Sequence, residues 1–234
     1  MQVPPAAGRF PLVVYLPGGG FVVAPRRMAR RQRAWIAAAG YVVAGVAYRT
    51  TRQGATLDDA LADVRDAVTF LTERADEFRI DAERIALWGE SAGGYLASVA
   101  GLGDERIGAV VDQFGASDLA RVAEGFDEPM VRAMGDLQGP IRRFRADETD
   151  PVDLIHPGAP PFLLLHGDDD RVISPVQTRL LHEALLAAGA VSKRYVLGGA
   201  GHGRLSLTGR QARVWTSVEV MSLIREFLDG AMKG

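Results

Sequence analysis

Continuous apolar runs alternate with amphipathic ones along this chain, and the alternation predicts most of its secondary structure. Apolar runs of strand length, without a polar face, indicate strands covered on both sides, as in a parallel sheet. We expect such strands at 11–16, 41–48, 84–88, 107–114, 161–165 and 194–197. Helical spacing or composition predicts helices at 34–39, 57–74, 95–100, 180–188 and 214–228, and residues 80–83 are expected to form a turn. Strands and helices in this order predict an α/β fold, a doubly wound, mostly parallel sheet flanked by helices.

One connection is much longer than the others. Roughly 45 residues separate the fourth expected strand from the fifth, against the short connections usual in such folds. Residues 116–157 are therefore expected to form either a surface helix pair or a small cap over the site, within a single domain spanning 1–234. The methionines and phenylalanines of this insert suit a pocket for flexible acyl or alkyl groups.

Composition narrows the chemistry. The chain has 234 residues, 47% of them hydrophobic, with no cysteine, four histidines and a net charge of −2. Thiolate catalysis and cysteine-bound metals are excluded, and the histidine spacing predicts no metal site and no cofactor. The near-zero net charge gives no basic field to recruit nucleic acid, no apolar run reaches transmembrane length, and no signal sequence is recognisable, so we expect a cytoplasmic enzyme.

A Gly-x-Ser-x-Gly pattern, Gly89 to Gly93, follows the third expected strand and precedes a helix. Strand, sharp turn and helix form the context in which such a serine becomes an exposed nucleophile, here Ser91. The motif alone is weak, since a glycine-rich turn with a capping serine has the same pattern. It needs a base, an acid that orients the base, and oxyanion donors elsewhere in the chain.

Other strand ends offer these partners. Three glycines, 18–20, follow the first strand, where N–H groups without a neighbouring Cβ can form an oxyanion hole together with the N–H of Ala92. The fifth strand is followed by three acids, 168–170, any of which could orient a base. His202 follows the sixth strand in a glycine-rich turn with no evident apolar packing partners, and we expect this imidazole to be the base. The remaining histidines, His156, His166 and His182, are expected to have structural roles.

These motifs together resemble the α/β-hydrolase serine esterases, particularly the hormone-sensitive-lipase-like and bacterial feruloyl- and acetyl-esterase-like groups. The resemblance covers nearly the whole chain: the Gly-Gly-Gly-Phe at 18–21, the Tyr-Arg pair at 48–49, the run from 81 to 94, the acid loop at 166–173 and Gly-His at 201–202. It implies a triad of Ser91, Asp170 and His202, and it selects Asp170 from the three acids. It also implies oxyanion donors at Gly19, Gly20 and Ala92, with Phe21 and Val22 beside the substrate.

Two departures from this family pattern change the expectation. Proline stands at position 17 where the family has histidine, and it cannot make the hydrogen bonds by which that histidine holds the glycine loop. The chain also begins close to its first buried strand, so the family's N-terminal strands are expected to be reduced, leaving an exposed sheet edge or a homodimer contact.

The sequence thus predicts a serine carboxylic-ester hydrolase acting through an acyl-enzyme on small to medium acyl or aryl esters. Two alternatives remain open. One is a peptidase of the prolyl-oligopeptidase type, which shares the acid and histidine loops. The other is a non-catalytic protein of the same fold that binds a ligand, which the proline at 17 would favour.

Overall fold

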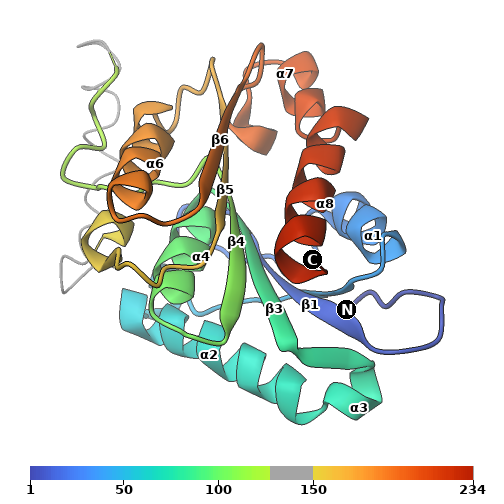
Figure 1. The fold of residues 1–234 in the computed structure, drawn as a ribbon. Coiled ribbons are helices and arrows are strands. Elements are labelled where there is room, and N and C mark those ends of the chain that lie inside the picture. The colour runs from blue at the N-terminus through green and yellow to red at the C-terminus, as the bar shows by residue number, and fades with distance from the viewer. Residues whose placement is uncertain (127–149, 234) are drawn as a thin grey trace.

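A six-stranded parallel sheet forms the centre of the computed structural model, which describes residues 1–126 and 150–233 (Figure 1). Its strands lie in the order β2-β1-β3-β4-β5-β6, and every neighbouring pair is parallel. The strands are β1 (Phe10–Leu16), β2 (Val42–Gly45), β3 (Ile80–Glu90), β4 (Ile107–Gln113), β5 (Phe162–Gly167) and β6 (Ser192–Leu197). The predicted fold class is confirmed, and each expected strand is present with ends shifted by a few residues.

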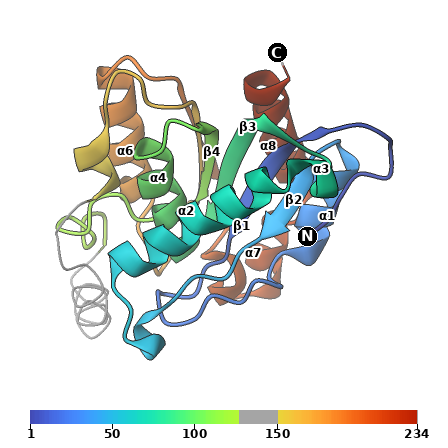
Figure 2. The same ribbon diagram turned by 90° about the horizontal axis from the view of Figure 1, so that it is seen from below.

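Helices cover both faces of the sheet. They are α1 (Arg30–Ala38), α2 (Leu57–Glu73), α3 (Ala75–Phe78), α4 (Ala92–Leu102), α6 (Val176–Ala187), α7 (Gly209–Val214) and α8 (Val218–Met232), with 3-10 turns η1 (Thr51–Gln53), η2 (Pro151–Leu154) and η3 (Gly203–Leu205). One buried cluster joins the sheet to α2, α4 and α6, and a second joins its other face to α1 and α8 (Figures 1 and 2). Alternate residues of one strand divide between the clusters: Val14 belongs to the first and Val13 to the second.

The turn expected at residues 80–83 is instead an irregular part of β3. One residue step on β1, from Pro11 to Leu12, pairs with the span from Asp81 to Ile85 on β3. The extra residues bulge out of the pairing, and the Arg84 Nε donates a 2.8 Å hydrogen bond back to the Asp81 carboxylate. Turn-forming residues are thus accommodated as a bulge without ending the strand.

Two further expectations need correction. The closing helix expected at 214–228 is α8, which begins only at Val218 because Ser217 caps it by accepting a hydrogen bond from the Val220 N–H, and the short helix α7 before it was not expected. The sheet edge at β2 is not fully open, since Gln2 makes an antiparallel bridge to Val43 through two backbone hydrogen bonds of 2.8 Å. Most of the insert expected at 116–157 lies outside the described residues, which cover only its two flanks.

Candidate active site

Ser91 lies in the tight turn between β3 and α4, in a backbone conformation that is unfavourable for a side chain. Its φ is 54° and its ψ is −120°. The Ser91 N–H donates to the carbonyl oxygen of Gln113 on β4 at 2.9 Å, which fixes the corner to the neighbouring strand. A residue other than glycine at positive φ carries strain that the surrounding structure has to offset. The strand–turn–helix corner expected around Ser91 is therefore present.

Ser91, His202 and Asp170 form one continuous hydrogen-bonded chain. The Oγ of Ser91 is 2.8 Å from the Nε2 of His202, and the Nδ1 of His202 is 2.7 Å from the Oδ2 of Asp170. The three residues come from the ends of three different segments, after β3, β5 and β6. Such a geometry lets an imidazole accept the serine proton while a carboxylate holds its other nitrogen.

The carboxylate of Asp170 is buried and fully engaged. Its Oδ1 accepts the N–H groups of Val172 and Ile173, and its Oδ2 also lies 3.4 Å from the Nε2 of His166. Burial by itself would raise the pKa of Asp170, but hydrogen bonds from His166 and His202 lower it well below its usual range. The carboxyl of Asp170 is thus ionised at neutral pH.

The environment of His202 differs from the expectation of an unpacked, glycine-rich turn. His202 is buried, and its ring lies edge-on to that of Phe114, with centroids 4.8 Å apart. Phe114 in turn packs against Trp215, whose indole N–H donates to the carbonyl oxygen of Gly201 at 2.8 Å. Aromatic packing from β4 and α7 therefore orients the imidazole, and these partners are too distant in sequence to be found from the histidine loop.

The other histidines make structural contacts, as expected. The Nε2 of His166 lies 2.9 Å from the carbonyl oxygen of Ile173 and so ties the acid loop together. His156 lies against the Leu102 carbonyl oxygen and accepts the Gly158 N–H. The Nδ1 of His182 lies 2.8 Å from the Oγ of Ser192.

The glycine loop is held by residues that follow β2. Tyr48 is buried, and its hydroxyl donates a 2.8 Å hydrogen bond to the carbonyl oxygen of Pro17. Thr51 donates both its N–H and its hydroxyl to the Phe21 carbonyl oxygen. The Tyr-Arg pair thus has two distinct tasks, since Arg49 pairs with Asp59 and Asp63 and anchors the segment to α2. The sequence left open what holds the glycine loop, because Pro17 cannot make the hydrogen bonds of the usual histidine. In the structure the phenol of Tyr48 holds it.

Backbone contact sets the spacing between this loop and the serine corner. A Cβ on Gly93 would lie 2.1 Å from the carbonyl oxygen of Leu16, and a Cβ on Gly18 would lie 2.9 Å from that of Glu90. No side chain fits at either position, so the end of β1 and the start of α4 pack backbone against backbone. The loop then turns at Gly19 and Gly20, whose φ angles are 152° and 61°. On the other side, the residue after Ser91 is Ala92, the first residue of α4, which carries the third expected oxyanion N–H.

An apolar cavity of about 610 Å³ opens at the serine. Ser91, His202 and the glycine loop line it, together with Phe21 and Val22 as expected from the sequence. Phe21 packs edge-on against Tyr95 of α4, with ring centroids 5.6 Å apart. Leu119 and Val122, from the described flank of the insert, contribute to the same wall. The cavity can bury an apolar substituent next to the nucleophile.

Two carboxyl groups close to the corner, those of Glu90 and the fully buried Asp112, received no role from the sequence. Burial raises the pKa of Glu90, directly before the serine, above its usual value. Burial also raises the pKa of Asp112, on β4, to about 7, although its carboxyl accepts the Gly115 N–H at 2.9 Å and lies 3.3 Å from the Ser98 hydroxyl. Glu90 occupies a variable position of the serine motif, and Asp112 lies inside otherwise ordinary strand sequence.

Residues 1–126 and 150–233 contain neither a metal-binding cluster nor a helix that could cross a membrane. Within these ranges no group of three histidines or carboxylates has the geometry to hold a metal ion. In the same part of the chain no helix has both the length and the apolar character needed to cross a membrane.

The fold and site can now be compared with known proteins. Esterase LipC of Mycobacterium tuberculosis (strain ATCC 25618 / H37Rv) is 30% identical over 217 residues, which cover 82% of this chain and 53% of LipC. The propionate-bound esterase Est2 of Thermogutta terrifontis is 25% identical, with a TM-score of 0.78 over 98% of this chain and 87% of Est2. A truncated carbohydrate esterase from gut microbiota, 19% identical, has a TM-score of 0.82 over 98% of this chain and 88% of its own.

The chain spans about half the length of the curated relatives it matches, as with LipC at 53% and LipQ of the same organism at 48%. The structural likeness, in contrast, extends over nearly the whole chain and identifies the fold as that of the α/β-hydrolases. The model of the BD-FAE family matches residues 1–185, well over half of the 234 residues. By that match, the chain belongs to the BD-FAE family.

Proposed function

We propose that this protein is a serine carboxylic-ester hydrolase that works through an acyl-enzyme. The observation that carries the proposal is the hydrogen-bonded chain from Ser91 through His202 to Asp170, placed at the wall of an apolar cavity. The esterase names of LipC and of the Thermogutta protein support the same reaction class.

In this mechanism, His202 removes the hydroxyl proton of Ser91 as its Oγ attacks the ester carbonyl carbon. The carbonyl π electrons move to oxygen, and the N–H groups of Gly19, Gly20 and Ala92 stabilise that oxyanion, each donor being worth on the order of 3 kcal/mol. The tetrahedral intermediate collapses and expels the alcohol, which receives the proton from His202. Asp170 stays ionised throughout and stabilises the imidazolium.

Water then releases the acyl group by a second addition and elimination, in which water is the nucleophile and Ser91 is the leaving group. His202 removes a proton from the water, hydroxide oxygen adds to the acyl carbon, and Ser91 leaves with the proton returned to its Oγ. The acyl substituent is proposed to lie against Phe21, Val22 and Tyr95, a wall that favours small to medium acyl or aryl groups. No cofactor is required for these steps, and the described flank of the insert, with Leu119 and Val122, is proposed to form part of the wall around the acyl group.

The test is turnover of p-nitrophenyl acetate and butyrate by the wild-type protein and by Ser91→Ala, with folding checked by circular dichroism. We expect the variant to be folded and inactive, and a fluorophosphonate to label Ser91 of the wild type stoichiometrically. A folded wild type that neither hydrolyses these esters nor accepts the label would leave a non-catalytic ligand-binding protein as the better description. Faster turnover of an aminoacyl-naphthylamide than of the esters would favour the peptidase.

A further inference from the structure

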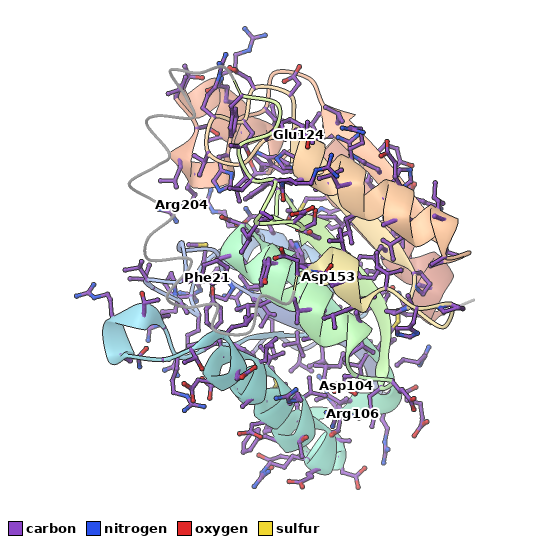
Figure 3. All side chains as sticks on the ribbon, turned by 90° about the vertical axis from the view of Figure 1, so that its left-hand side faces the viewer. Phe21, Asp104, Arg106, Glu124, Asp153 and Arg204 are labelled. Atoms are coloured by element: carbon purple, nitrogen blue, oxygen red, sulfur yellow. The ribbon has the colours of Figure 1, made fainter. Side chains whose placement is uncertain are left out.

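A second cavity, of about 600 Å³, adjoins the catalytic one on the side of α1 and α7. The two cavities share Met28, Glu90, Phe114 and Arg204 along their common boundary. Figure 3 shows Arg204 and Phe21, which both line the catalytic cavity, on the same side of the molecule. The second cavity therefore lies directly beside the one that contains Ser91.

The wall of this second cavity is rich in arginine. Arg27, Arg30, Arg31, Arg204 and Arg213 all contribute to it, and Trp35 and Trp215 supply aromatic surface between them. All five arginines are exposed to solvent, and among the residues that the structure describes no carboxylate lies within ion-pair distance of any of them. Some arginines elsewhere do have such partners, as Arg106 does in Asp104 and Arg84 in Asp81.

The absence of carboxylates here follows from the sequence. The first 57 residues contain eight arginines and no Asp or Glu, and the stretch between Glu183 and Glu219 contains five basic residues and no acidic one. The fold brings these two acid-free segments together at one cavity, in a chain whose net charge is only −2. The net charge of the whole chain is near zero, yet the arginines produce a positive field at this cavity, which the net charge alone could not predict.

The arginine-bearing segment before α1 is held in place by a buried arginine of its own. Arg33 donates its Nε to the Met28 carbonyl oxygen at 3.0 Å and its Nη2 to that of Arg26 at 3.1 Å. The segment enters α1 through Ala29, whose φ is 52°, with no side-chain cap and no acidic residue in the first turn. The positive end of the helix dipole therefore adds to the arginine charge, as a secondary contribution.

Glu90 is the one carboxyl that lines the cavity within the described residues, and no ion pair joins it to an arginine among them. Burial raises the pKa of Glu90, and the positive charge of Arg204 lowers it. A single carboxyl leaves most of the charge of five arginines uncompensated. Unpaired guanidinium groups around an aromatic-walled cavity bind carboxylate, sulfate or phosphate through charge-assisted, often bidentate hydrogen bonds.

We propose that the arginine-lined cavity binds an anionic group on the alcohol portion of the ester substrate. This proposal rests on the proposed esterase function. The alcohol portion is chosen because His202 must hand its proton to the leaving oxygen, and the residues directly after it, Gly203 and Arg204, continue into the arginine-lined cavity. The protein is then selective for esters of negatively charged alcohols with apolar acyl groups.

The test compares two acetate esters with closely matched leaving groups. One is the acetate of 4-(4-hydroxyphenyl)butanoic acid, which carries a carboxylate, and the other is the acetate of the corresponding primary amide, which is neutral. We expect kcat/KM to be about tenfold or more higher for the anionic ester, and the ratio to decline as ionic strength rises, because exposed charges are screened. An ester with the carboxylate on the acyl portion and a neutral phenol should show no such preference.

Variants locate the effect. The double variant Arg30→Gln/Arg31→Gln should bring the anionic-to-neutral ratio to near one, and the corresponding double lysine variant should keep part of it. The matched control is Arg52→Gln, which removes another exposed arginine of the acid-free segment, one that forms no ion pair with any described residue and lines neither cavity. Its ratio should remain that of the wild type.

The neutral ester separates the possible failures. If the wild type hydrolyses neither ester, the proposed esterase function is wrong. If it hydrolyses the neutral ester but shows no preference for the anionic one, or if the glutamine double variant keeps the preference, the esterase function stands and the anion site is wrong. A preference for the acyl-side carboxylate would also overturn this assignment.

Discussion

The hydroxyl of Tyr48 donates a hydrogen bond to the carbonyl oxygen of Pro17 at 2.8 Å, and this bond supports the loop that carries Gly19 and Gly20. Burial raises the pKa of Tyr48 well above its usual value, so the phenol stays protonated and remains a donor across the working pH range. Pro17 thus occupies the first position of the glycine loop, and Tyr48, which follows β2, holds the loop in place.

Tyr48→Phe should therefore reduce turnover. Loss of the donor leaves a buried carbonyl oxygen unpaired and the loop less well fixed, which we expect to lower kcat for p-nitrophenyl acetate by about tenfold and the free energy of unfolding by about 1–2 kcal/mol. The control is Tyr41→Phe, which removes a 2.7 Å hydrogen bond from a buried tyrosine to Asp229, far from the serine. Equal kcat losses in the two variants would mean that the Tyr48 bond has no specific role in catalysis.

The choice of Asp170 among three consecutive acids gives a second prediction. Asp170→Asn should reduce kcat/KM by on the order of 10⁴, because an amide does not hold His202 in the required tautomer. Asp169→Asn is the matched control, since Asp169 pairs with Arg171 at the surface and lies outside the hydrogen-bonded chain. Steady-state rates at one pH near 8 suffice. Similar losses in both variants would remove the basis for assigning Asp170 as the orienting acid.

Strain at the serine corner can be measured directly. Ser91→Gly relieves a φ of 54° that Ser91→Ala retains, so the glycine variant should be more stable than the alanine variant by about 1 kcal/mol. At Ser98, inside α4, the order should reverse, because glycine costs about 1 kcal/mol relative to alanine in a helix. Urea denaturation of the four variants tests both signs, and the same order at both positions would contradict the strain.

Asp112 predicts an unusual pH dependence of stability. Its pKa, raised by burial to about 7, exceeds that of an unfolded aspartate, so the native state holds a proton that the unfolded state has lost between about pH 4 and 7. This group therefore lowers stability as pH rises through that window. Asp112→Asn should abolish the loss and be more stable than the wild type at pH 8, by at most about 4 kcal/mol.

The control for this prediction is Asp104, whose pKa is shifted in the opposite direction to that of Asp112. Hydrogen bonds from Arg106 lower the pKa of Asp104, so its contribution to stability is present above about pH 4 and is lost as pH falls. Asp104→Asn should therefore destabilise the protein at pH 8, whereas Asp112→Asn stabilises it. Denaturation midpoints at pH 5 and pH 8 for the three proteins provide the comparison.

Sequence patterns predicted the features of this protein that depend on local order. Apolar runs located the strands, and the positions directly after them located Ser91, His202 and a group of three acids, because in a parallel sheet those positions converge at one edge. The resemblance to known esterases then selected Asp170 from the three acids. The bulge in β3 was missed because turn-forming residues stand there, and pairing with β1 prevailed over their local preference.

Features that depend on contact between distant segments could not be predicted in the same way. The packing of Phe114 on His202, the bond from Tyr48 to Pro17 and the meeting of two acid-free segments each join residues separated by more than 30 positions. Their residue types are ordinary, and only the fold shows which of them come together.

The close packing of Gly18 and Gly93 has a consequence for how this protein can change. Main-chain contacts at Gly18 and Gly93, with support from the Tyr48 hydroxyl, hold the serine corner and the glycine loop together, so the side chains that line the two cavities do not set this spacing. Phe21, Val22 and the cavity arginines can be exchanged one at a time while the bond-breaking step stays intact. Selectivity in this scaffold is thus open to redesign by libraries confined to those side chains, with positions 18 and 93 kept constant.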